Sequence, residues 1–103
     1  MRRLPVHLSS EALKDIAGIR RYLLKEAGPA VSSRVVGRIR KKLASIEHMP
    51  RTGGPRPEFG EGVRFHISGS YVIYVLVRDH GVEVLRVLHA AQDRDAIMHK
   101  RDD

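Results

Sequence analysis

The sequence predicts an α+β fold, in which an N-terminal strand and an antiparallel two-helix hairpin pack on a small, mainly antiparallel sheet (β-α-α-β-β-β). Two patterns support this prediction. Apolar residues recur every three or four positions through residues 10–48, which is the period of an amphipathic helix. From residue 63 to residue 89 they alternate with polar residues or run without a break, as they do in strands. The length of 103 residues fits a single domain spanning residues 1–103.

The first strand is predicted at residues 3–8, where Leu4, Val6 and Leu8 point to the same side. Ser10 is expected to cap the following helix, because its hydroxyl can accept hydrogen bonds from free backbone N–H groups. Gly28 is expected to end that helix, since glycine readily adopts the left-handed conformation found at helix ends.

The two helices are predicted at residues 10–27 and 29–48, and the tight link between them favours an antiparallel hairpin. Each helix has one apolar face. These faces consist of Ala12, Ile16, Ile19 and Leu23 in the first helix and Val36, Ile39, Leu43 and Ile46 in the second.

Residues 49–62 are predicted to form a loop, because they are rich in proline and glycine. Three strands are predicted after it, at residues 63–68, 71–77 and 82–89, and short turns make them an antiparallel meander. The apolar run of the middle strand places it at the centre of the sheet, covered on both faces.

Alternation along the strands predicts which side chains share a face. In the first strand of the meander, Val63, Phe65 and Ile67 are expected to point inward, toward the helices, with Arg64 and His66 on the opposite, more polar face. In the last strand, Leu85 and Val87 are expected on one face and Arg86 on the other.

The composition excludes several kinds of site. No cysteine is present, which excludes disulfides, thiolate nucleophiles and cysteine-ligated metals. The longest apolar run, Tyr71–Val77, is far shorter than the ~20 residues of a membrane helix, so a cytoplasmic protein without membrane contact is expected. The six histidines lack metal-ligand spacing, and no glycine-rich phosphate loop opens a helix. We therefore expect no metal and no cofactor.

The positive charge is concentrated in the N-terminal half. The chain has a net charge of +7, and residues 1–50 carry all of this excess. Such a balance favours an acidic partner: nucleic acid, an anionic surface or an acidic protein segment. On the second helix, Arg34, Arg38, Lys41 and Lys42 follow helical spacing on the side away from the apolar face, so they could meet phosphates or an acidic peptide, or simply face solvent.

Acid–base cleavage of RNA is an alternative function. Cleavage by the 2′-hydroxyl needs a base, an acid and cations near the phosphate. Arg64, His66, Arg86 and His89 would supply these groups if they met on the open face of the sheet. Against this, residues 49–90 contain no lysine and the C-terminal tail contains no tyrosine. The simpler alternative is that the four are ordinary polar positions on a solvated face.

Nearly the whole chain resembles the ParE toxins of the RelE/ParE superfamily. The order and spacing of five segments carry the resemblance: residues 8–12, 46–53, 62–65, 71–75 and 84–89, with Asp93 soon after. The resemblance implies a small toxin of a type II toxin–antitoxin module, neutralised by a ParD-like antitoxin in a hetero-oligomeric complex. It implies that DNA gyrase is the target, that the toxin is a protein-binding inhibitor rather than an enzyme, and that DNA is contacted only indirectly, through the antitoxin.

Two alternatives accompany this reading. RelE-type members of the superfamily are ribosome-dependent mRNA endoribonucleases, and a toxin-like fold can also serve only as a binding module. Residues expected to bind the antitoxin or the target are Arg20, Arg21, Arg34, Arg38, Lys42, Arg64, Arg86 and Arg94. Apolar anchors in grooves beside the hairpin should supply most of the affinity, while arginines steer the partner and the sheet edges accept an extended peptide.

Overall fold

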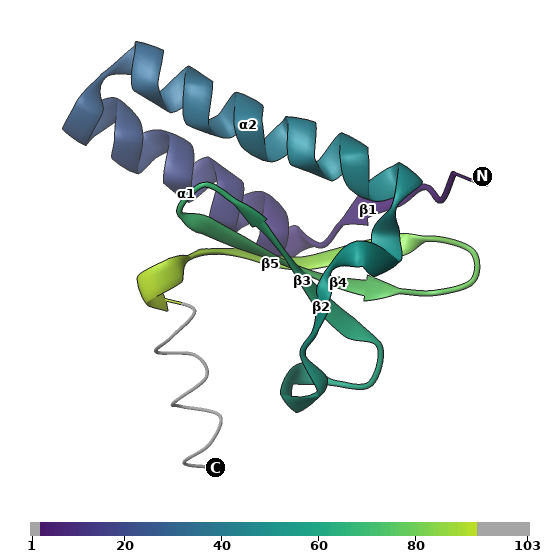
Figure 1. Ribbon diagram of the computed structural model, residues 1–103. Helices are drawn as coiled ribbons and strands as arrows, with labels where there is room; N and C mark the ends of the chain where they lie inside the picture. The colour runs from purple at the N-terminus through teal and green to yellow at the C-terminus, as the bar shows by residue number, and fades with distance from the viewer. Residues whose placement is uncertain (1–2, 93–103) are drawn as a thin grey trace.

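The computed structural model describes residues 3–92 and has two layers, a helical hairpin and a sheet (Figure 1). The predicted α+β class is confirmed. The elements in chain order are β1 (Val6–Leu8), α1 (Ser10–Ala27), α2 (Pro29–His48), η1 (Pro50–Thr52), β2 (Gly54–Pro55), η2 (Pro57–Phe59), β3 (Val63–Ser68), β4 (Tyr71–Val77) and β5 (Val82–His89). Both helices and the three strands of the meander have the bounds that the sequence predicts.

The ends of α1 are set by local chemistry. Ser9, not Ser10, is the N-cap, because Ser9 has the extended conformation that a cap requires and its Oγ accepts a hydrogen bond from the Ala12 N–H at 3.0 Å. Gly28 ends the helix at φ 92°, as expected, and its N–H donates to the Leu23 carbonyl.

The sheet has five strands in the order β1-β5-β4-β3-β2, so β4 is central as predicted. β1 runs parallel to β5, and the other pairs are antiparallel. The first strand is shorter than the predicted 3–8, because the Leu4 N–H donates to the Glu47 carbonyl of α2 instead of joining the sheet. The predicted loop 49–62 also contains two short 3-10 helices and β2, which pairs with β3 and adds a fifth strand.

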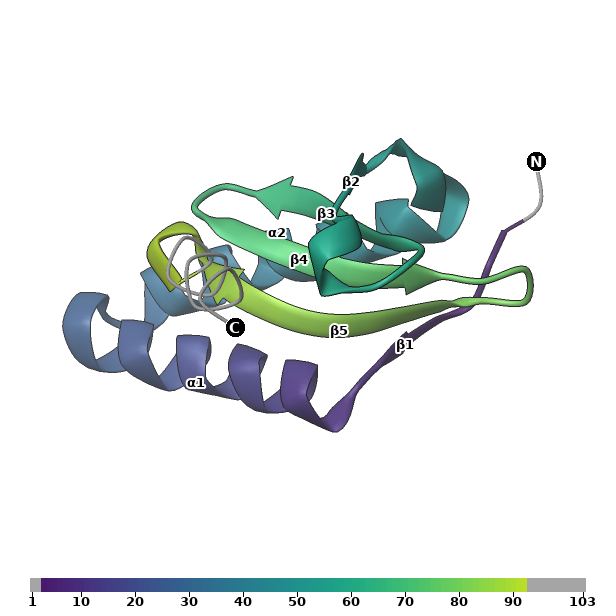
Figure 2. The same cartoon turned by 90° about the horizontal axis from the view of Figure 1, so that it is seen from below.

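The main core lies between the hairpin and one face of the sheet. Figure 2 shows both helices on the same side of the strands, with α1 alongside β5. The apolar faces of the two helices meet Ile73, Val75, Val84 and Val87 there, and Ile39 and Ile73 are fully buried. Within this layer, the buried Ser32 hydroxyl donates to the Arg20 carbonyl at 3.0 Å and ties α2 to α1.

The opposite face of the sheet is apolar rather than polar. Val63, Val72 and Tyr74 form a second cluster there, and Phe59 and Phe65 pack against it. The predicted facing of β3 is therefore wrong. The register pairs Arg64 with Val75 and His66 with Ile73, which places both polar residues on the helix side. Alternation in the sequence separates two faces but does not say which one meets the helices.

The prediction that Leu85 and Val87 share a face of β5 is wrong, because the strand contains a β-bulge. Val84 pairs with Val75 and Arg86 pairs with Tyr74, so Leu85 is the extra residue. Leu85 consequently packs in the second cluster, whereas Val87 lies in the main core. The two residues are on opposite faces, because one inserted residue shifts the alternation of everything that follows.

Candidate functional site

Arg64 and His66 hold the segment that follows α2. Arg64 Nη1 donates to the Gly53 carbonyl at 2.7 Å, and His66 Nε2 lies 3.2 Å from the Pro50 carbonyl. Because a carbonyl only accepts, Nε2 carries the proton of this imidazole. A side chain at Gly53 would collide with the Phe65 carbonyl and the His66 ring, so glycine permits this close approach.

The chemistry of His66 is that of a buried structural group. Only 5% of its surface is exposed. Burial lowers its pKa below the ordinary value of 6.5, and the nearby Lys42 and Arg64 act in the same direction, against the hydrogen bond to Pro50, which raises it. The ring is neutral at physiological pH, and its Nε2 proton is engaged in the hydrogen bond to the Pro50 carbonyl.

Arg86 binds α1 rather than facing an open site. Its Nε and a terminal nitrogen lie 2.8 and 3.0 Å from the two Asp15 oxygens, and Glu11 lies 4.0 Å away. The hydrogen bond to Asp15 is the main cause that raises the pKa of Arg86. Asp15 also accepts the Val87 N–H at 2.9 Å, so this carboxylate covers the free edge of β5 beyond β1.

His89 lies at the end of β5, against the Tyr71 ring at a centroid distance of 5.4 Å. Its Nδ1 accepts the Ala91 N–H at 3.1 Å. The structure therefore does not bring the four candidate catalytic residues together. Arg64 and His66 contact the segment after α2, Arg86 contacts α1, and His89 stands beside Tyr71.

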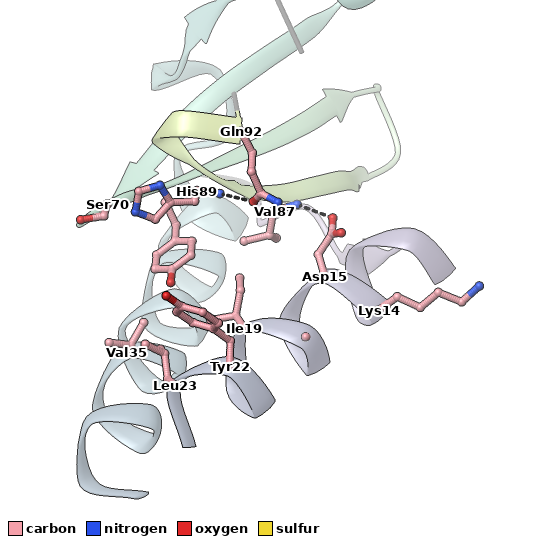
Figure 3. A pocket seen from close by; sticks show the side chains of 12 residues that line it. Lys14, Asp15, Ile19, Tyr22, Leu23, Val35, Ser70, Val87, His89 and Gln92 are labelled. Carbon is pink, nitrogen blue, oxygen red and sulfur yellow. Dashed lines mark hydrogen bonds between the residues drawn. The ribbon is translucent and has the colours of Figure 1, made fainter. Parts of the chain in front are cut away.

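A groove of about 720 Å³ opens between the hairpin and the ends of β4 and β5 (Figure 3). Both helices project beyond the sheet at this end (Figure 1). Their apolar residues Ile19, Leu23 and Val35 are partly exposed there. The lining residues are Lys14, Asp15, Gly18, Ile19, Tyr22, Leu23, Val35, Ser70, Tyr71, Val87, His89 and Gln92.

Aliphatic and aromatic side chains dominate this groove. Figure 3 shows Ile19, Leu23, Val35 and Val87 around it, with Lys14 at its rim. Tyr22 is 64% exposed although it is aromatic. Burial, with a smaller contribution from Tyr22, raises the pKa of Tyr71. The groove therefore presents apolar surface and two tyrosine side chains to solvent.

Besides Arg64 and Arg86 on the strands, five of the expected binding cations lie on the two helices. Arg21 and Arg34 are exposed, and Arg20 and Lys42 are partly covered. Arg38 lines a smaller pocket of about 140 Å³ together with Val35 and the turn between β3 and β4. Arg94 lies outside the described residues. Among residues 3–92, no group of three or more histidine or acidic side chains is placed to hold a metal ion, and no helix is both long and apolar enough to cross a bilayer.

The sequence predicts grooves beside the hairpin but does not identify Tyr22 as one of the groove residues. A signal was present: Tyr22 directly precedes Leu23 and so lies at the border of the apolar face of α1. What the sequence does not contain is the position of the sheet end relative to the hairpin. That position decides whether the border residue is covered.

Comparison with known proteins gives a consistent result. Residues 6–94 match the family model of the ParE toxin of the type II toxin–antitoxin system parDE. The fold is similar to a solved structure of the chromosomal ParDE TA system from P. aeruginosa, with a TM-score of 0.74 and 18% sequence identity over 86% of this chain and 98% of that chain. No curated protein matches the chain. Because the family model spans most of the sequence, the chain belongs to the ParE toxin family of type II toxin–antitoxin systems.

Proposed function

We propose that this toxin inhibits DNA gyrase, and that a ParD-like antitoxin neutralises it by binding the groove between the helical hairpin and the sheet. The composition of the groove carries the antitoxin part of the proposal, because it combines aliphatic residues and an exposed Tyr22 with cations nearby. The gyrase part is supported by membership of the ParE family.

The chemistry of the groove fits an amphipathic, acidic segment. Apolar side chains of the partner would enter between Leu23 and Val35, where they lose contact with water. Lys14 at the rim and Arg38 beside the smaller pocket would pair with carboxylates. The four cations Arg20, Arg21, Arg34 and Arg38 add long-range attraction, which acts mainly on the association rate.

An extended part of the same partner has a place on β3. β2 pairs only with Arg64 and Phe65, so β3 has no strand beside it from His66 to Ser68 on that side, within the described chain. A peptide strand could add there through backbone hydrogen bonds. The edge ends at the turn next to Arg38, close to the groove, so one partner segment could use both surfaces.

Ribosome-dependent RNA cleavage is the second-ranked function. It needs an acid, a base and cations within reach of one phosphate. In this chain Arg86 is paired with Asp15, and His66 is buried and bonded to Pro50. This arrangement favours a protein-binding inhibitor over a nuclease.

The antitoxin part is tested by two alanine substitutions on α1. Tyr22→Ala removes a groove residue, whereas Leu24→Ala removes a side chain that is also exposed but lies outside the groove. We expect Tyr22→Ala to weaken binding of a co-expressed ParD-like antitoxin by at least about tenfold, as buried interface tyrosines commonly do. Leu24→Ala should stay within about twofold. Equal effects of the two substitutions would place the antitoxin elsewhere.

The gyrase part is tested separately with purified toxin. We expect inhibition of DNA supercoiling by gyrase and intact mRNA in a translating extract. Codon-linked mRNA cleavage that His89→Ala abolishes would reverse the ranking of the two functions. If antitoxin binding depends on Tyr22 while gyrase is unaffected, only the gyrase part fails.

A further inference from the structure

The outward face of α2 is a second surface, which adjoins the smaller pocket at Arg38. No acidic residue occurs between Glu26 and Glu47, although this stretch carries five lysines and arginines. Arg34, Arg38 and Lys41 are spaced by four and three residues, so they lie on one side of the helix, opposite the buried Val36 and Ile39. We call these three residues the α2 stripe. At about 1.5 Å per residue, neighbouring cations are about 4.5–6 Å apart along the axis.

The α2 stripe is free to bind a partner. All three side chains are exposed. Among residues 3–92, none of them forms an ion pair with a carboxylate, unlike Arg3, which pairs with Glu47, and Arg86, which pairs with Asp15. Their charges are therefore not neutralised within the described chain. Three neighbouring uncompensated cations attract a polyanion.

The chemistry of the rest of this face favours nucleic acid over protein. The exposed large apolar residues are Leu13, Tyr22, Leu24, Met49 and Ile67, and none of them lies within α2. Small exposed side chains occupy the α2 surface instead, at Ser33, Gly37 and Ala44. A protein interface derives most of its affinity from buried aromatic or aliphatic anchors, which this face lacks. A phosphate backbone requires only cations on an accessible surface.

A duplex fits better than a single strand. Proteins that hold single strands stack bases on aromatic side chains. Tyr22 is the exposed aromatic residue in the described chain, and it lines the groove rather than the α2 stripe. We propose that the α2 stripe binds the phosphate backbone of double-stranded nucleic acid without reading its sequence. This contact is direct, and so differs from DNA binding through an antitoxin.

Duplex binding would also bring the toxin close to gyrase, a role that rests on the proposed function. Gyrase acts on duplex DNA, so a toxin that binds duplex phosphates would be concentrated near its target. The binding itself does not depend on that function, because it is measured on the free toxin without antitoxin or gyrase.

The test compares two triple charge reversals by fluorescence anisotropy with a labelled DNA duplex of random sequence. One variant is Arg34→Glu/Arg38→Glu/Lys41→Glu on α2. The matched control is Lys14→Glu/Arg21→Glu/Lys25→Glu on α1, where all three side chains are also exposed. Each variant lowers the net charge from +7 to +1. Circular dichroism and urea unfolding check that both variants are folded. If one of them is not, a variant with glutamine instead of glutamate at the same three positions takes its place.

We expect the α2 variant to lose affinity at least about tenfold more than the α1 control. Its plot of log K against log salt should also be shallower by about three, one for each phosphate contact removed. Equal losses in the two variants would overturn the proposal, because binding would then depend only on total charge.

Three further ligands complete the test. An RNA duplex of matching length shows whether the α2 stripe prefers the phosphates of DNA or of RNA. Binding of either duplex through the α2 stripe supports the proposal. Tighter binding of single-stranded than of double-stranded DNA would overturn the duplex preference. If poly-glutamate bound as tightly as the duplex and with the same dependence on the α2 stripe, the partner would be an acidic protein instead.

Discussion

The two ends of the layer between helices and sheet differ in how they are covered. At one end, residues 50–55 fold against β3, where Pro50 and Gly53 accept hydrogen bonds from His66 and Arg64. At the other end, the hairpin projects past the sheet and leaves the groove beside Tyr22 and Val35 open. We refer to these as the closed end and the open end.

Polar residues in a strand therefore do not by themselves mark a functional site. The closed end contains two of the four candidate catalytic residues, His66 and Arg64, yet both hold residues 50–53 in place. The open end is mostly apolar, and it is the end where a partner can remove surface from water. Side chains that the rest of the chain covers stabilise the fold, whereas side chains that it leaves uncovered are available to a partner.

The largest expected effect compares one leucine toward each end. Leu43 is buried in the main core, so Leu43→Ala should lower the free energy of unfolding by about 2–5 kcal/mol. Leu23 is half-buried in the groove, so Leu23→Ala should cost only about 1 kcal/mol. Urea unfolding measures both. Equal losses would mean that the groove end is packed as tightly as the core.

Two glycines test the close approach at the closed end. Gly53→Ala should destabilise the fold by about 1–3 kcal/mol, because the new methyl group would collide with Phe65 and His66. Gly37 on α2 has open space around it, so Gly37→Ala should instead stabilise the helix by about 0.5–1 kcal/mol. Thermal and urea unfolding of both variants decide the matter. A neutral Gly53→Ala would contradict the packing described for residues 50–55.

His66 makes the stability of the closed end depend on pH. Its pKa is lowered in the folded state, so folding favours the neutral ring. The stability linked to this group is complete above the unfolded pKa of about 6.5 and declines as the pH falls below it, until the lower folded pKa is reached.

We therefore expect a lower urea midpoint at about pH 5.5 than at about pH 7.5. His66→Gln keeps an N–H that can donate to Pro50 but does not titrate, so it should reduce this difference. His80→Gln, in the exposed turn between β4 and β5, is the control and should leave the difference unchanged. An unaltered pH dependence in His66→Gln would assign the effect to other groups.

The smallest expected effect concerns the face of the sheet away from the helices. Tyr74 is 4% exposed, and its hydroxyl has no hydrogen-bond partner in the described chain. Tyr74→Phe removes a buried unpaired polar group, so stability should be unchanged or rise by up to about 1 kcal/mol. Calorimetry or urea unfolding checks this, with Tyr71→Phe as the comparison at the groove. A clear loss in Tyr74→Phe would mean that the hydroxyl is hydrogen-bonded in solution.

Much of the fold could be predicted because its signals are local and long. The prediction of the helices at residues 10–27 and 29–48 rests on an apolar pattern that repeats over many helical turns and is interrupted at Gly28. The structure of the loop before β3 is harder to predict, because β2 has only two residues and acquires its strand conformation by pairing with β3. Such short elements depend on contacts between distant residues, which a local pattern does not contain.

The amino-acid pattern alone predicts the main helices and strands, their order, the excess positive charge of the first fifty residues and the resemblance to the ParE family. Which face of each strand meets the helices depends on the packing of the whole chain. Alternation is symmetric between the two faces, so it does not predict the register that pairs His66 with Ile73 or the bulge at Leu85. The groove was decided in the same way, because it exists where the hairpin outreaches the sheet, and the length of that overhang is a property of packing rather than of any single segment.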